Sequence, residues 1–143
     1  MPATVAQILA VKGRDVWSIP ADTTVYKALQ VMAERGVGAL LVMDGERLVG
    51  IVSERDYARK VILLDRVSRR TAVSEIMTGD PQTVTPSNSV TDCMTLMTEL
   101  RVRHLPVVED DGVVGLISIG DVVKHVISEQ ESLIAQLEQY ITG

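Results

Sequence analysis

The chain has 143 residues, of which 46% are apolar and 23% charged, and this is the composition of a folded globular domain. Fourteen Lys and Arg residues face nineteen Asp and Glu residues, and the net charge of −5 argues against nonspecific binding to nucleic acid. The single Cys93 excludes an intramolecular disulfide and a cysteine-rich metal site.

No apolar run approaches the roughly 20 residues that a membrane-spanning helix needs. The first ten residues contain no Lys or Arg, unlike the start of a secretory signal. We therefore expect a soluble protein of the reducing cytoplasm, with no membrane partner and no transit peptide. Because Phe is absent, the core must consist of Val, Ile, Leu, Met and Ala.

An internal repeat organises the sequence. A shift of 65 residues, without a gap, superimposes ten identical residues: Val25, Met32, Glu34, Val37, Leu40, Val42, Val49, Gly50, Ser53 and Asp56 fall on Val90, Met97, Glu99, Val102, Leu105, Val107, Val114, Gly115, Ser118 and Asp121. We expect two copies of one unit, at residues 1–65 and 66–127, followed by a C-terminal helix within 128–143.

The first copy starts with a short apolar helix at 5–9 and a brief extended piece at 17–20. A helix follows, with Thr23 or Thr24 as its expected N-cap. Its apolar residues have the i, i+3, i+4, i+7 spacing of a buried stripe: Val25, Ala28, Leu29 and Met32. An apolar strand at 39–43, a polar turn at 44–47 and a strand at 48–53 then predict a hairpin.

The second copy has the same order, and Asp56 and Asp121 each open a further helix. Its helix has Ser87 or Ser89 as the expected N-cap and the apolar residues Val90, Cys93, Met94 and Met97. The remaining segments are a helix at 73–77, an extended piece at 82–85 and strands at 105–108 and 113–118. Neither copy has enough core to fold alone, so we expect the two to pack sheet to sheet.

Residues 128–140 predict a helix whose apolar stripe is Val126, Leu133, Leu137 and Tyr140. Two interpretations stay open at this point. The helix packs on its own domain, or it forms a contact between subunits.

The duplicated order of elements, closed each time by Gly-x-x-Ser-x-x-Asp, resembles a CBS-domain pair, also called a Bateman module. The resemblance covers about residues 1–127 and is most specific in GIVSERD (50–56), RHLPV (103–107) and GLISIGD (115–121). The run at 52–63 resembles small stand-alone bacterial CBS-pair proteins. The resemblance to a CBS-domain pair implies a mixed α+β fold of two small sheets with flanking helices in a pseudo-twofold arrangement. It also implies a homodimer in which two pairs form a flat disc.

The Ser and Asp of each motif lie where a strand gives way to a helix. Free backbone N–H groups at a helix N-terminus suit a phosphate, and an Asp can accept hydrogen bonds from both hydroxyls of a ribose. The alternative is that Asp56 and Asp121 are only helix N-caps. The Ser-x-x-Asp motif occurs at the same place in both repeats, and this duplication favours ribose binding over a capping role alone.

In the family, each nucleotide site is shared between the repeats. The resemblance therefore implies one site with Ser118 and Asp121 beside the backbone of Val37, Gly38 and Ala39 and the piece near Trp17. The other combines Ser53 and Asp56 with the strand at 102–105 and with Thr78, Gln82 and Val84 from the piece at 78–84. We expect Gly38 and Ala39 to let an adenine ring approach the backbone closely.

Phosphate needs positive charge, which Arg supplies with a planar fork of donors. The resemblance assigns Arg103 to the Asp121 site, and we assign Arg55 to the Asp56 site. At the position of the other copy that is equivalent to each arginine, the sequence has a glycine. We therefore expect one arginine in each site. His104 and Lys12 are further candidates, and the alternative for the two arginines is an ordinary solvated surface position.

The predicted function is regulatory binding of an adenine nucleotide, with AMP as the first candidate ligand and NAD, ADP or ATP as others. We expect no enzyme activity, because the sequence has no Walker run and no His with carboxylates at ligand-like spacing. No metal is needed for the fold. The alternatives are a protein-interaction scaffold without a nucleotide and an enzyme with an unrecognised site. A partner protein, not identified by the sequence, would respond to the bound nucleotide.

Overall fold

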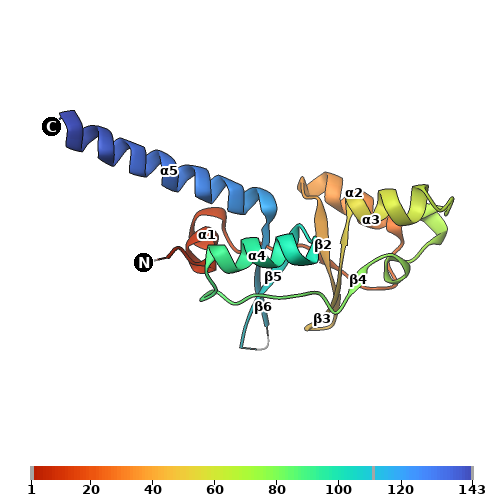
Figure 1. Cartoon of the computed structure of the whole chain (residues 1–143). Helices are drawn as coiled ribbons and strands as arrows, with labels where there is room; N and C mark the ends of the chain where they lie inside the picture. The colour runs from red at the N-terminus through yellow and green to blue at the C-terminus, as the bar shows by residue number, and fades with distance from the viewer. Residues whose placement is uncertain (1, 111, 143) are drawn as a thin grey trace.

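The computed structural model describes residues 2–110 and 112–142 (Figure 1). The first repeat contains α1 (Val5–Lys12), β1 (Ser18–Ile19), α2 (Val25–Arg35), β2 (Ala39–Asp44), β3 (Arg47–Ser53), α3 (Glu54–Tyr57) and a π-helical turn, η1 (Ala58–Ile62). The 3-10 turns η2 (Ser68–Arg70) and η3 (Val73–Glu75) lead to β4 (Thr78–Gly79), α4 (Val90–Leu100), β5 (His104–Glu109), β6 (Gly112–Ser118) and α5 (Ile119–Thr142). The predicted order is confirmed, except that the 3-10 turn Val73–Glu75 stands in place of the helix expected at 73–77.

Each repeat is built on an antiparallel hairpin, as the alternation of apolar strand and polar turn predicts. The first sheet has the order β1-β2-β3-β4, with β1 parallel to β2 and the other neighbours antiparallel. The second sheet is the hairpin β5-β6, beside which Val84 forms a parallel bridge to Val107. Gly45 has a φ of 62° in the turn of the first hairpin, a conformation that glycine adopts at no steric cost.

Helix starts follow the capping residues in the sequence. The side chain of Thr24 accepts from the N–H of Lys27, and that of Ser89 from the N–H of Asp92, so these are the N-caps of α2 and α4. Ser53 occupies the same position before α3, with Asp56 at the third helical residue. The interpretation of Asp56 as an N-cap is therefore wrong, because the N-cap is Ser53, three residues earlier.

The two cores exchange their short N-terminal segments. Val5, Ile8 and Leu9 of α1 are buried in the core of the second repeat, with Cys93 and Ile117. In the other direction, Val73 of η3 and Ile76, the residue that follows η3, are buried in the core of the first repeat. The boundary at 65/66 remains a prediction about the sequence repeat, whereas each packed core takes a segment from both copies.

The two repeats meet through the faces of their hairpins. Ala39, Leu41 and Ile51 of the first sheet are buried and pack with Val113 and Leu116 of the second. The opposite face of β2 carries Leu40 and Val42 into the helical core. Both faces of β2 are therefore covered, which explains its continuous apolar sequence.

The C-terminal segment continues α5 and projects away from the domain (Figure 1). Val122 is buried and Val126 packs on the second core, but residues 128–142 are exposed. Leu133 and Leu137 are 55% and 53% exposed. The interpretation that this segment packs on its own domain is therefore wrong. In the part of the chain that the structure describes, no helix has the length and apolar character to cross a membrane.

Candidate functional site

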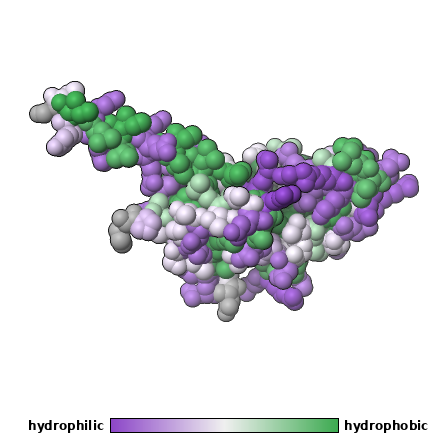
Figure 2. Space-filling view, viewed as in Figure 1, coloured by the Kyte–Doolittle hydropathy of each residue, from purple (hydrophilic) through white to green (hydrophobic). Residues whose placement is uncertain are grey.

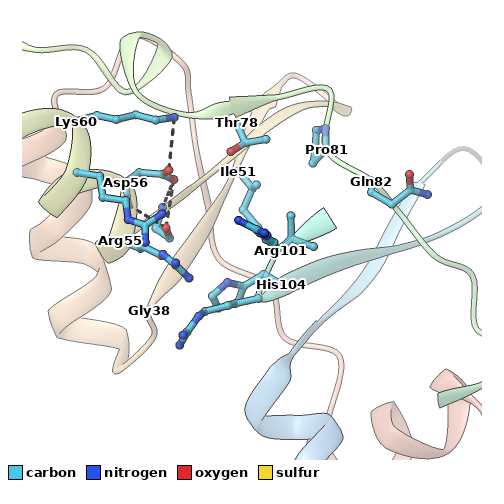
Figure 3. Close-up of a pocket in the computed structure, with 14 residues that line it drawn as sticks. Gly38, Ile51, Arg55, Asp56, Lys60, Thr78, Pro81, Gln82, Arg101 and His104 are labelled. Carbon is cyan, nitrogen blue, oxygen red and sulfur yellow. Dashed lines mark hydrogen bonds and ion pairs between the residues drawn. The ribbon is translucent and has the colours of Figure 1, made fainter. Parts of the chain in front are cut away.

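A cleft of about 330 Å³ lies between the repeats, and we call it the Asp56 cleft (Figure 3). Its volume is at the lower end of the range of small-molecule sites. The cleft is lined by Gly38, Ile51, Ser53, Arg55, Asp56, Arg59, Lys60, Thr78, Pro81, Gln82, Arg101, Val102, Arg103 and His104. It therefore combines the Ser-x-x-Asp turn of the first repeat with the start of β5 in the second.

The turn from β3 into α3 fixes the carboxylate of Asp56. The N–H of Ser53 donates to Oδ2 of Asp56 at 2.9 Å, and the N–H of Asp56 donates to Oγ of Ser53 at 3.2 Å. Lys60 Nζ lies 3.6 Å from Oδ1 of Asp56 and donates to the carbonyl of Ile76. Oδ1 accepts no hydrogen bond from the residues that the structure describes, so it is available to ligand hydroxyls.

Positive charge surrounds this carboxylate. Of the lining residues, the cationic ones are Arg55, Arg59, Lys60, Arg101 and Arg103, and the only carboxylate is Asp56. Figure 3 shows Arg55 and Lys60 entering from the helical segment after β3, and Arg101 and His104 from the second repeat. The charge of Arg59, followed by desolvation and the charge of Arg103, lowers the pKa of Arg55 from its ordinary value. The cations therefore repel one another.

His104 lies between the two Ser-x-x-Asp turns. Burial lowers its pKa, and the charge of Lys12 acts in the same direction, whereas Asp121 and Asp56 oppose the shift. The lowered pKa favours the neutral imidazole, which offers one donor and one acceptor to a ligand.

The second Ser-x-x-Asp turn has the same backbone geometry but a different partner. The N–H of Ser118 donates to Oδ2 of Asp121 at 2.8 Å, and Lys12 Nζ donates to the same oxygen at 2.6 Å. Lys12 also donates to the carbonyl of Leu116 at 2.6 Å. Burial opposes ionisation of Asp121, but the hydrogen bonds from Lys12 and Ser118 outweigh it and lower its pKa.

A smaller recess of about 200 Å³ lies next to Lys12. It brings together Lys12, Trp17, Val37 and Ala39 of the predicted Asp121 site, while neither Ser118 nor Asp121 lines it. Lys12, which lines the recess, donates a hydrogen bond to the Asp121 carboxylate.

Three predicted site residues lie elsewhere than expected. Gly38 and Arg103, assigned to the Asp121 site, line the Asp56 cleft instead. They occupy equivalent positions in the two repeats, immediately before each hairpin, where both repeats approach the same cleft. Val84 lines neither space, because its side chain is 2% exposed in the second core. Arg55 and Arg103 both line the Asp56 cleft, and Lys12 is paired with Asp121 at the other turn. The expectation of one arginine for each site stays a prediction.

Sequence reasoning missed the cleft residues Arg59, Lys60 and Arg101. Arg59 and Lys60 lie four residues after Arg55 and Asp56, a spacing that places side chains on one helical face and was a usable signal. Arg101 is the C-cap of α4 and lines the cleft, and no spacing in the sequence relates it to the Ser-x-x-Asp turn.

Models of protein families match the CBS domain to residues 7–63 and 73–128. The chain belongs to the CBS-domain family. It is 41% identical to the mitochondrial CBS domain-containing protein CBSX3 of Arabidopsis thaliana, over 98% of this chain and 72% of that protein.

Two solved structures place the fold among CBS pairs. A CBS-domain protein from Burkholderia ambifaria is 53% identical, with a TM-score of 0.86 over 90% of this chain and 96% of that chain. A CBS-domain protein from Pyrobaculum aerophilum, complexed with AMP, is 25% identical, with a TM-score of 0.73 over 82% of this chain and 88% of that chain. The mixed α+β CBS-pair fold is therefore confirmed, and the chain is a CBS-pair module of the regulatory type.

The reactive side chains of this CBS pair are few. In residues 2–110 and 112–142, no group of three or more His, Cys, Asp or Glu side chains lies close enough to hold a metal ion. Burial raises the pKa of the Cys93 thiol to about 11. A buried, protonated thiol is not a nucleophile, so Cys93 belongs to the core of the second repeat, as its place on the α4 stripe predicts.

Proposed function

We propose that this CBS pair is a regulatory module that binds an adenine nucleotide of the AMP type in the Asp56 cleft, without covalent chemistry. The observation that carries the proposal is the position of the Asp56 carboxylate. It lies at the edge of an inter-repeat cleft with basic side chains around it, and among the described residues Oδ1 has the Lys60 ion pair at 3.6 Å but accepts no hydrogen bond. This combination suits a ribose joined to a phosphate.

Each part of the nucleotide has a proposed contact. Oδ1 of Asp56 accepts from the ribose hydroxyls, and Arg55 and Arg103 donate to the phosphate. Gly38, Thr78 and Gln82 line the remaining wall, where backbone groups and aliphatic carbons fit a flat base. His104 adds a hydrogen bond to the ligand. The relative complexed with AMP supports this ligand class for the cleft.

The Asp121 turn remains a proposed second site, with Ser118, Trp17, Val37 and Ala39. Lys12 occupies one oxygen of Asp121, so we expect this site to bind more weakly than the Asp56 cleft. NAD, ADP and ATP share the adenosine group with AMP and are the other candidate ligands.

Titration calorimetry with AMP tests the proposal. Asp56→Ala should weaken binding at least tenfold, since a hydrogen bond to a charged group contributes about 1.5–3 kcal/mol. Asp121→Ala removes the equivalent carboxylate of the other repeat and should leave the tighter binding event in place. Circular dichroism of each variant checks the fold. If the wild-type protein binds no adenine nucleotide at millimolar concentration, the interaction-scaffold interpretation replaces this proposal. Conversion of a bound nucleotide that depends on the protein would favour an enzyme.

We also propose a homodimer, built on apolar faces that the repeats share. Ile62 of η1 and Ile127 of α5 occupy equivalent positions and are 57% and 50% exposed. Leu63 and Val123 extend these faces, and Figure 2 shows apolar side chains along the projecting α5. Self-association would cover them, and a nucleotide between the repeats could then change the dimer contacts that a partner protein recognises. The proposed compartment remains the reducing cytoplasm.

A further inference from the structure

We infer that the Asp56 cleft selects a nucleotide with more than one phosphate group, such as ADP or ATP, over AMP. This inference rests on the proposed function and names the ligand class of the same site. Its basis is the number of basic side chains, their lack of protein partners and the backbone conformation of one of them.

The charge in the cleft exceeds what a monophosphate neutralises. Five cationic side chains and one carboxylate line it, which leaves four positive charges in a chain whose net charge is −5. A phosphate monoester carries about −1.5 to −2 at pH 7. AMP therefore compensates roughly half of the charge, whereas a diphosphate or triphosphate compensates more of it.

The arginines of the cleft lack acidic partners in the described parts of the chain. Lys60 is 3.6 Å from Asp56, but no carboxylate described in the structure forms an ion pair with Arg55, Arg59, Arg101 or Arg103. The charges of Arg59 and Arg103 also disfavour the charged state of Arg55. An anion that spans the three side chains would relieve this repulsion.

Arg101 adds an independent observation. It ends α4 in the left-handed conformation, with φ 56° and ψ 38°. The equivalent residue of the first repeat is Gly36, which ends α2 with φ 65° and ψ 36°. Glycine is the usual residue at this helix end, because a Cβ disfavours the left-handed region. The second repeat therefore holds a charged side chain at the cleft in a backbone conformation that favours glycine, as functional sites often do.

The two repeats also differ in the number of basic side chains near their Ser-x-x-Asp turns. Arg59 lines the cleft, while its equivalent Lys124 is exposed on α5 and lines neither the cleft nor the Lys12 recess. The Asp121 turn has Lys12, already hydrogen-bonded to Asp121. Of the two Ser-x-x-Asp turns, the one that contains Asp56 therefore has the larger group of basic side chains beside it, where a polyphosphate chain would lie.

Calorimetric titrations of the whole chain with AMP, ADP and ATP, at fixed ionic strength and without divalent cations, test the inference. ATP should bind at least about tenfold more tightly than AMP, which corresponds to about 1.4 kcal/mol. Arg59→Ser should reduce most of this preference by weakening ATP more than AMP. Lys124→Ser, the matched change in the second repeat, should leave the preference intact.

Arg101→Gly separates binding from stability. Because glycine suits the left-handed position, this variant should melt at the same or a higher temperature than the wild-type chain, while losing preference for ATP. A lower melting temperature with an unchanged ATP preference would overturn the role of Arg101.

The outcomes distinguish this inference from the proposed function. Equal affinity for AMP and ATP, with both weakened by Asp56→Ala, overturns the inference and leaves the proposed function in place. Absence of binding by every adenine nucleotide overturns both. Inorganic tripolyphosphate serves as a probe without base or ribose, and if it binds as tightly as ATP, selection of a nucleotide is wrong.

Discussion

Lys12 and Asp121 form an ion pair of 2.6 Å that joins the end of α1 to the first turn of α5. In the first repeat, the equivalent carboxylate of Asp56 lies 3.6 Å from Lys60, which hydrogen-bonds to a backbone carbonyl instead. The same Ser-x-x-Asp turn thus serves two purposes. In one repeat it holds together segments that are 109 residues apart in the sequence, and in the other it presents a carboxylate to the cleft.

Lys12→Met should reduce stability at neutral pH by at most about 1 kcal/mol, because the pair is partly exposed. The folded pKa of Asp121 is lowered, so the pair stabilises the fold above the unfolded pKa of about 3.9. That contribution is lost as the pH falls through the lowered folded value. Urea unfolding at pH 7 and at pH 3 measures the difference, and an equal loss at both pH values would contradict the account.

Arg103→Ala should weaken AMP binding at the Asp56 cleft by about 1.5 kcal/mol, the lower end for a charged hydrogen bond, because Arg103 is exposed. Adenosine, which has no phosphate, should bind almost as it does to the wild type. Titrations of both ligands in an Asp121→Ala background isolate the cleft. Arg47→Ala, an exposed arginine outside the cleft, is the control. Equal losses for AMP and adenosine would assign Arg103 to the fold rather than to the phosphate.

Gly115→Ala should destabilise the fold by about 1–3 kcal/mol through overpacking. A Cβ at this position would lie 2.8 Å from Cδ2 of Leu9, whose side chain is 1% exposed. Thermal or urea unfolding measures the loss. Gly79→Ala is the control, because a Cβ there meets nothing within 4 Å. An unchanged stability of Gly115→Ala would contradict the packing of α1 on the second repeat.

Ile127→Asp places a charge on the exposed apolar face of α5 and should shift a dimer toward the monomer without unfolding it. Light scattering coupled to gel filtration measures the mass. Ser128→Asp changes a neighbouring exposed residue outside the apolar stripe and should leave the mass unchanged. A dimer that survives both Ile127→Asp and Ile62→Asp would contradict the proposed interface.

The elements and the repeat could be predicted because they depend on local patterns. A few neighbouring residues determine the apolar stripe of α2, the hairpin turns and the N-caps Thr24 and Ser89. The exchange of α1 and η3 between the cores depends on contacts between distant segments, which no local pattern contains. The identity of the packed partners therefore needed the structure.

The candidate site was predicted in part for a similar reason. Backbone turns place Ser53 and Asp56 reliably, and their pairing with the start of β5 follows from the pseudo-twofold arrangement. The direction of a long side chain such as that of Arg103 depends on strand twist and on the neighbouring repeat. No local sequence pattern determines that direction, so the lining of the Asp56 cleft by Arg103 needed the structure.

The most direct test of the account is an amide chemical-shift map of the isotope-labelled protein during titration with AMP. We predict that the largest changes fall on Gly38, Ser53, Thr78 and His104, the four positions where three different strands and the loop before β2 border the cleft. Smaller or later changes are expected near Trp17 and Ser118. Changes concentrated on α5, or no change at millimolar AMP, would contradict the assignment of the Asp56 cleft as the nucleotide site.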